Sequence, residues 1–215
     1  MADVDVLDTR EVDGVKYRVY LLPDEDAESP RDYDGNAGMI VCRPDRDYLW
    51  PSEDGDNVSA QEVGFAFRDE DSFGLHHEGR SFRAVARWLR MCHGATVVLP
   101  LYDASSGLSV GNVDDTPDAG DYVGVTFDQP STREGIPEGH MVEALTVDVQ
   151  EYARWATGEV YGYVVERQAP AAHPECHAVH AGEQWEQVDS LWALIGHEYA
   201  EKAALEAFDA CTDRT

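Results

Sequence analysis

The chain has 215 residues, 43% of them hydrophobic, and carries 43 acidic against 16 basic side chains, which gives a formal net charge of −27. This charge disfavours direct nucleic-acid binding, because phosphate contacts require a basic surface. No run of about 18 apolar residues occurs, so the sequence predicts no membrane-spanning helix and no membrane partner. The N-terminus is acidic where a secretory signal would be basic and then apolar. We therefore expect a soluble protein of the host cytoplasm.

The acidic residues are spread along the whole chain, and Lys16 and Lys202 are its only lysines. Two interpretations stay open. Low lysine with dispersed aspartate is typical of adaptation to a salty, halophilic cytoplasm, where molar salt shortens the screening length to about 3 Å. Alternatively, the carboxylates imitate phosphates and occupy a DNA-binding enzyme. A DNA mimic would gather its acid on one face, so the dispersal favours salt adaptation.

The chain opens with a predicted β-hairpin. Residues 4–7 and 15–22 alternate between apolar and polar side chains, as half-buried strands do. Asp13 and Gly14 lie between them and suit a type I′ turn, in which both central residues have positive φ. The elements that follow are two acidic loops and two short strands: loops at 23–37 and 43–62, strands at 38–42 and 63–67.

The segment Ser81–Tyr102 joins a helix signal directly to a buried-strand signal. Ser81 is a good N-cap, apolar residues recur at helical spacing as far as Cys92, and Gly94 stands where a residue with positive φ ends a helix. Residues 95–101 then predict a strand that is apolar on both faces, which implies cover on both sides.

The second half of the chain predicts further strands and two more helices, with an insertion before the last strand. The strands are at 108–110, 122–127, 160–165 and 188–195, the helices at 142–156 and 196–211, and the insertion at 167–187. Together these elements predict a single α+β domain over residues 1–215. We expect a mainly antiparallel sheet with the three helices packed largely on one of its faces.

The densest group of metal-ligand side chains lies within the insertion. Three imidazoles and one thiol occur within eight residues, at His173, Cys176, His177 and His180. This composition suits Zn²⁺. Zinc sites normally draw their ligands from two separated segments, however, so the alternative is a local elaboration without metal. Otherwise the sequence predicts no cofactor.

A second group combines carboxylates with hydroxyls. Paired carboxylates serve as general acid and base or hold Mg²⁺, whereas aspartates at turns also cap backbone N–H groups. No phosphate-binding glycine loop, nucleophile elbow or H-E-x-x-H motif accompanies them. The candidates are Asp103, Ser105, Ser106, Asp118, Glu159 and Asp189.

Several motifs resemble a group of uncharacterised proteins of tailed phages and related elements. They include WLR-x-x-x-GA-x-VVLPLY at Trp88 to Tyr102, EYARWATGEVYGYVVE at Glu151 to Glu166, and VDS-x-W at Val188 to Trp192. The resemblance covers about residues 81–199 and implies a viral setting without implying an activity. The group runs almost directly from one strand into VDS-x-W, which supports the interpretation of the insertion as a local elaboration.

These observations favour a non-enzymatic accessory protein of viral origin, from a salt-adapted host, that acts by binding another protein. One alternative is an acidic DNA mimic that inhibits a host DNA-binding enzyme. The other is a small hydrolase or transferase that uses the carboxylate group at Asp103, Asp118 and Glu159.

The charge generates a prediction about salt. Lowering the salt lengthens the screening distance from about 3 Å at 1 M to about 10 Å at 0.1 M, so repulsions among the carboxylates reappear together. Each exposed pair contributes only a fraction of a kcal/mol, but many act against a net stability of about 5–15 kcal/mol. We expect the Tm, followed by circular dichroism, to rise steeply from about 0.1 M to about 2 M KCl. A constant Tm would favour the DNA mimic.

Overall fold

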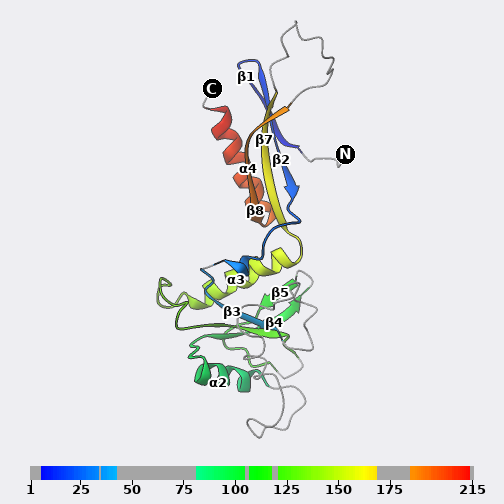
Figure 1. Cartoon of the computed structure of the whole chain (residues 1–215). Coiled ribbons are helices and arrows are strands. Elements are labelled where there is room, and N and C mark those ends of the chain that lie inside the picture. The colour runs from blue at the N-terminus through cyan, green and yellow to red at the C-terminus, as the bar shows by residue number, and fades with distance from the viewer. Residues whose placement is uncertain are drawn as a thin grey trace. The chain divides into compact units, whose positions relative to one another are not determined.

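The computed structural model describes residues 6–33, 35–42, 81–104, 107–117, 121–168 and 185–213 (Figure 1). Its elements are β1 (Val6–Val12), β2 (Val15–Pro23), the 3-10 helix η1 (Pro30–Asp32), β3 (Gly38–Cys42), α2 (Phe82–Cys92), β4 (Val98–Ala104), β5 (Gly107–Val110), β6 (Gly124–Asp128), α3 (Met141–Ala156), β7 (Val160–Gln168), β8 (Trp185–Ile195) and α4 (His197–Thr212). They form two antiparallel four-stranded sheets. The predicted α+β class with antiparallel pairing is confirmed.

The chain divides into two compact units, each with its own sheet. The first unit combines Met1–Glu28 with Gly158–Thr215, and the second is Ser29–Thr157. The sequence analysis expects one sheet and one core. The difference arises because the first hairpin pairs with strands far along the chain: Arg18 and Glu166, cross-strand neighbours, are 148 residues apart. That residues 1–215 form a single domain stays a prediction.

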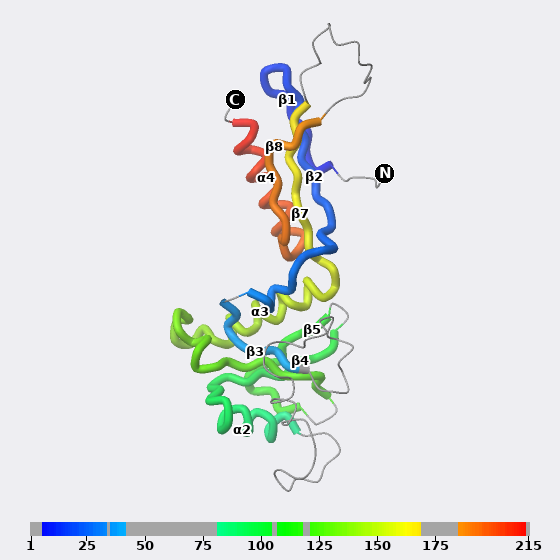
Figure 2. The backbone as a smooth tube through the Cα atoms, in the orientation of Figure 1, coloured from blue at the N-terminus to red at the C-terminus, as the bar shows by residue number. Residues whose placement is uncertain are grey.

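The first sheet has the strand order β1-β2-β7-β8, and α4 packs along one face of it (Figures 1 and 2). The predicted hairpin turn is confirmed, because Asp13 and Gly14 have φ of 51° and 80° between the paired residues Val12 and Val15. Alternation along the strands sends one set of side chains toward α4. The core between the sheet and α4 contains Tyr17, Val19, Leu21, Tyr163, Val165, Leu194, Ala200, Ala204 and Phe208.

The second sheet has the order β3-β6-β4-β5, with α2 and α3 on opposite faces (Figure 1). Met39 and Val41 of β3 pack with α2, whereas Ile40 between them packs with α3. The expected packing of the helices largely on one face is therefore wrong for α2 and α3. The physical reason is that Val98 to Leu101 of β4 are all buried, so both faces of this central strand require cover.

The predicted helix after Ser81 is confirmed, and the strand after it begins later than expected. Ser81 caps α2 by accepting a hydrogen bond from the Ala84 N–H, and Gly94 has φ of 66° beyond the C-terminal end. Strand β4 begins at Val98 instead of residue 95. Thr96 and Val97 donate their backbone N–H groups to the Asp128 carboxylate, which removes them from the strand ladder.

The strand pair at the end of the chain is longer than predicted. Strand β7 reaches Gln168 and β8 begins at Trp185, and these two residues pair with each other. Both ends of the expected insertion 167–187 therefore belong to the sheet. Residues 169–184 lie outside the described part of the chain, as do the predicted strand 63–67 and the whole of the acidic loop 43–62.

The expected acidic loop 23–37 contains a buried arginine. Arg31 in η1 is 4% exposed and pairs with Asp148 of α3. The Asp148 carboxylate also accepts hydrogen bonds from the Ala37 N–H at 2.6 Å and the Gly38 N–H at 3.2 Å. Burial raises the pKa of Asp148, and Arg31 with the two amides opposes that rise. These contacts hold the segment that leads into β3 against α3.

A buried carboxylate at the end of β6 connects three segments of the second unit. Asp128 is fully buried and accepts hydrogen bonds from the Thr96 N–H at 2.8 Å, the Thr96 hydroxyl at 2.7 Å and the Val97 N–H at 2.7 Å. The guanidinium of Arg133 also donates to it. Burial alone would raise the pKa of Asp128, but these donors outweigh it, and the net pKa lies below the usual range.

We expect Asp128→Asn to lower the free energy of unfolding by about 2–3 kcal/mol in molar KCl, because an amide cannot accept all these donors. Since the folded pKa is lowered, the stabilisation by Asp128 is present above about pH 4 and is lost as the pH falls through the folded pKa. The stability gap between wild type and variant should therefore narrow in acid, as measured by denaturant unfolding. Asp103→Asn, at an exposed site, is the control, and a gap unchanged between neutral pH and about pH 3 would contradict the assignment.

Candidate functional site

The structure places the predicted carboxylate candidates in different parts of the fold. Asp103 is exposed near the end of β4 in the second unit. Glu159 is exposed directly before β7, and Asp189 is half-buried on β8, both in the first unit. Ser105, Ser106 and Asp118 lie outside the described residues.

Glu159 and Asp189 do not form an acid–base pair. Asp189 is opposite Val165 in the ladder, six residues along β7 from Glu159, which corresponds to about 20 Å at strand spacing. Asp189 instead accepts a hydrogen bond from the Tyr163 hydroxyl at 3.2 Å. Burial, followed by the charge of Asp189, raises the pKa of Tyr163. This arrangement gives Asp189 a structural role in the sheet.

The predicted metal ligands His173, Cys176, His177 and His180 lie outside the described residues. Within the described ranges, no group of three or more His, Cys, Asp or Glu side chains is placed to hold a metal ion. In the same part of the chain, none of the helices has the length and apolar character to cross a membrane.

The sheet of the first unit has a second face, opposite α4, whose side chains lie outside the core between the sheet and α4. Outward residues of β2 and β7 follow from the register, because residues paired across a ladder share a face. Side chains of β8 lie on the same face through their contacts with β2 and β7. We call it the aromatic face: Arg18, Tyr20, Leu22, Gly162, Val164, Glu166, Trp185 and Trp192.

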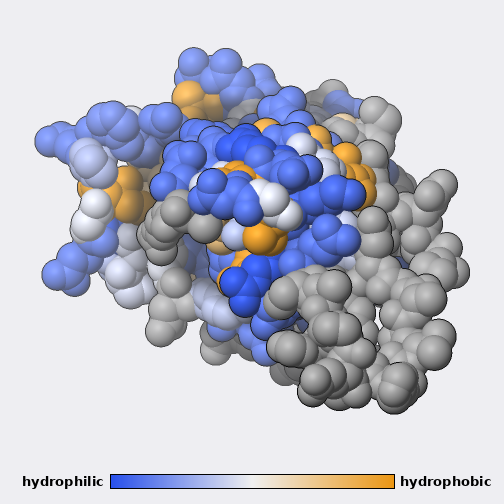
Figure 3. All heavy atoms as spheres, turned by 90° about the horizontal axis from the view of Figure 1, so that it is seen from above, coloured by the Kyte–Doolittle hydropathy of each residue, from blue (hydrophilic) through white to orange (hydrophobic). Residues whose placement is uncertain are grey.

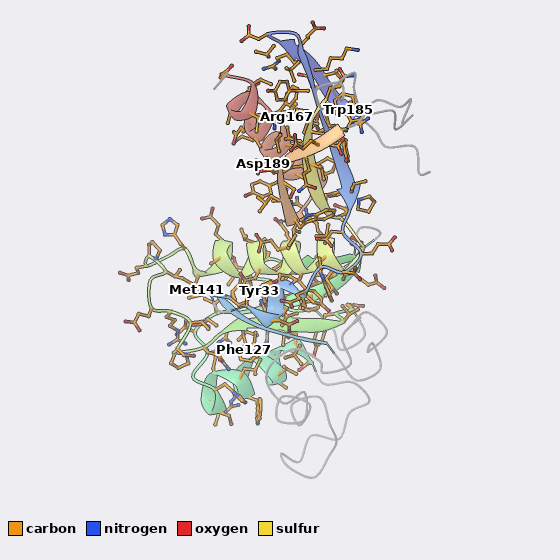
Figure 4. The ribbon with its side chains drawn as sticks, turned by 45° about the horizontal axis from the view of Figure 1, so that its top comes forward. Tyr33, Phe127, Met141, Arg167, Trp185 and Asp189 are labelled. Atoms are coloured by element: carbon orange, nitrogen blue, oxygen red, sulfur yellow. The ribbon has the colours of Figure 1, made fainter. Side chains whose placement is uncertain are left out.

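Arg18 lies at the centre of the aromatic face. Its Nε donates to Glu166 Oε2 at 2.7 Å, and an Nη atom lies 2.6 Å from the same oxygen. The guanidinium carbon is 4.1 Å from the centre of the Trp185 ring and 5.6 Å from that of Tyr20. The guanidinium thus lies near aromatic rings from β2 and β8, the strands on either side of β7. Trp185 begins β8, as Figure 4 shows.

Glu166 also acts on Tyr20. The pKa of Tyr20 is raised, first by burial and then by the charge of Glu166 and a hydrogen bond to its carboxylate. Glu166 therefore pairs with the Arg18 guanidinium and also acts on the Tyr20 phenol. Val164, opposite Tyr20 in the ladder, is buried beneath these side chains.

Trp192 lies over Gly162 at the other end of the face. A β-carbon on Gly162 would overlap the indole ring, so only glycine allows this approach. The register shifts between Tyr161 and Tyr163, where β8 gains a residue, and Ala193 has φ of 61°. Asp24 accepts the Ala193 N–H at 2.9 Å and holds the bulge in place. The bulge directs Trp192 onto the face.

Large apolar side chains remain exposed on this sheet. Trp192 is 46% exposed, and Val6, whose partner in the ladder is Tyr20, is 42% exposed. Leu191 and Val188 on β8 are also exposed. Trp, Tyr and Arg are the residue types enriched at the centres of protein interfaces. The two irregularities of β8 disfavour strand addition at its edge, so a partner would contact the side chains of the face.

The sequence names Trp192 and Gly162 only as members of motifs and predicts no surface role for Trp185, Trp192 or Gly162. Alternation along 15–22 correctly separates Arg18 and Tyr20 from the core residues, but it does not name their neighbours. Those neighbours come from β7 and β8, and the bulge that orients Trp192 leaves no signal in a period-2 pattern. Comparison with family models, with curated proteins and with solved structures found no match to this chain.

The glycine contact generates a prediction. Gly162→Ala should displace the Trp192 ring and lower stability by about 1–3 kcal/mol, the usual cost of overpacking. Tryptophan fluorescence should shift to longer wavelength as the ring enters water. In the Trp192→Ala background the methyl group added by Gly162→Ala meets no ring, so it should lower the free energy of unfolding very little. An equal loss of stability from Gly162→Ala in the wild-type and Trp192→Ala backgrounds would show that the ring does not lie over Gly162.

Proposed function

We propose that this chain is a non-enzymatic accessory protein of viral origin that acts in the cytoplasm of a salt-adapted host by binding another protein through the aromatic face. The single observation that carries the proposal is the combination of Arg18, Tyr20, Trp185 and Trp192 on a sheet face that α4 leaves uncovered. The resemblance of residues 81–199 to phage proteins supports the viral setting, and the low lysine content supports the salty host.

The exposed aromatic side chains are unusual for the surface on which they occur. With 43 acidic residues in the chain, water-facing positions are largely polar, and in the view of Figure 3 hydrophobic residues form small patches among hydrophilic ones. Exposing an indole at 46% has an unfavourable hydration free energy unless a partner covers it. The ion pair with Glu166 restrains Arg18 before binding, which reduces the entropy lost on binding.

The enzyme alternative has less support, because Glu159 is about 20 Å from Asp189 along the sheet and Asp189 binds the Tyr163 hydroxyl instead.

The test is affinity capture from host lysate in molar KCl, with matched variants. Trp192→Ala removes the exposed ring of the face, and Tyr199→Ala removes an aromatic ring that is 61% exposed on α4, outside the face. We expect Trp192→Ala to weaken binding of the captured protein by about 30-fold or more, the effect of losing a central interface residue. The Tyr199→Ala variant should bind as wild type does, with both affinities measured by calorimetry on the purified partner.

Three outcomes contradict the proposal. Equal affinity in wild type and Trp192→Ala would move the interface away from the aromatic face. Capture of no protein, together with turnover in a substrate screen, would favour the enzyme. Inhibition of a nuclease or restriction enzyme that depends on the acidic residues and not on Trp192 would favour the DNA mimic.

A further inference from the structure

The composition of α2 differs from that of the rest of this acidic chain. Among the α-helices that the structure describes, only α2 contains no Asp or Glu, although acidic residues outnumber basic ones 43 to 16 in the whole chain. Helix α2 instead contains three arginines, Arg83, Arg87 and Arg90. Helices α3 and α4 contain one Arg and one Lys, respectively, among several carboxylates.

The three arginines form one stripe on the outside of α2, which we call the α2 basic stripe. Spacings of four and three residues place Arg83, Arg87 and Arg90 on the same side of a helix, over about 10 Å along its axis. All three are exposed, and the opposite side of the helix is in the core. Met91, which is 69% exposed, follows Arg87 at a spacing of four residues and adds an apolar surface.

None of the three arginines pairs with a carboxylate among the residues that the structure describes. Elsewhere in this chain arginines do form ion pairs, at Arg10, Arg18, Arg31, Arg133 and Arg167. Arg154 is also unpaired within the described ranges, but it lies in the last turn of α3, where the helix dipole favours a cation. The helix dipole likewise favours Arg90, which lies in the last turn of α2, but it does not favour Arg83, which lies in the first turn.

Arg83 is in the first turn of α2, where the partial positive charge of the helix end favours acidic side chains. Its position therefore costs stability, and no intramolecular ion pair with the described residues offsets that cost. Among the described residues, neither helix formation nor ion pairing accounts for the position of Arg83. A carboxylate supplied by a partner would account for it.

We propose that the α2 basic stripe binds a short acidic segment of a partner polypeptide. Carboxylates accept two parallel hydrogen bonds from each guanidinium, an arrangement that keeps its geometry in high salt better than a long-range attraction does. Proteins adapted to a salty cytoplasm carry many surface carboxylates, so arginines without internal partners suit them. Met91 provides contact for the methylene groups of Asp and Glu.

A nucleic acid fits less well than an acidic peptide. Double-stranded DNA carries one negative charge per about 1.7 Å of axis and extends beyond the stripe on both sides, toward a chain with net charge −27. A peptide of about three extended residues already spans the stripe, at about 3.3–3.6 Å per residue. The stripe belongs to the second unit and the aromatic face to the first, so each surface is testable without the other.

The test is fluorescence anisotropy with the full chain and a labelled peptide of about eight residues rich in Asp and Glu, long enough to extend past both ends of the stripe. Binding is measured at the lowest KCl concentration at which circular dichroism shows the native fold, and then at rising KCl. The variant Arg87→Gln/Arg90→Gln is compared with Arg154→Gln/Lys202→Gln, which removes the same charge elsewhere. The Asn/Gln version of the peptide is the control probe.

We expect the Arg87→Gln/Arg90→Gln variant to weaken binding about 10-fold or more and the control variant to change it less than about two-fold. Arg87→Lys/Arg90→Lys should lose part of the affinity, because lysine keeps the charge and loses the paired hydrogen bonds. Absence of peptide binding, equal losses in both Gln variants, or tighter binding of single-stranded DNA of the same length would overturn the proposal. Trp192→Ala should leave peptide binding unchanged, which separates this result from the aromatic face.

Discussion

The pairing of β2 with β7 is the constraint on which the first unit depends. It joins the N-terminal hairpin to the C-terminal β7–β8 pair in one sheet, over a separation of 148 residues between Arg18 and Glu166. Closing so long a loop costs conformational entropy, which burial against α4 and the ladder itself must offset. The register also decides which side chains meet. A slip of one residue would move Tyr17 and Val19 out of the core.

The same register produces two chemically different faces. Toward α4 the sheet presents Tyr163, Val165 and other apolar side chains, and Arg10 at its edge reaches over the Phe208 ring to pair with Asp209. On the other side it presents guanidinium, phenol and indole groups. A helix covers the first face, so its apolar residues stabilise the fold. On the second face Glu166 pairs with Arg18, and α4 leaves the indole groups uncovered, which is why we assign the proposed binding role to it.

Buried carboxylates of the second unit have a different role from carboxylates at the surface. Asp128 and Asp148 are carboxylates that bind backbone N–H groups and one arginine each, and they hold loops against strands and helices. These contacts are shielded from salt by burial. Most of the other acidic residues in the described ranges lie at exposed positions. The α2 arginines belong to neither group, because they are exposed cations without described internal partners.

The sequence by itself determined the local elements. Asp13-Gly14 specified the hairpin turn, Ser81 and Gly94 specified the ends of α2, and the apolar residues within 95–101 specified a strand covered on both sides. Each of these features depends on neighbours within a few residues. The sequence also determined the net charge of −27. Tertiary structure alone decided the partition into two sheets, the opposite placement of α2 and α3, and the contact of Trp192 with Gly162. Those features depend on pairings between distant segments and on a bulge, and neither composition nor periodicity encodes which distant strands meet.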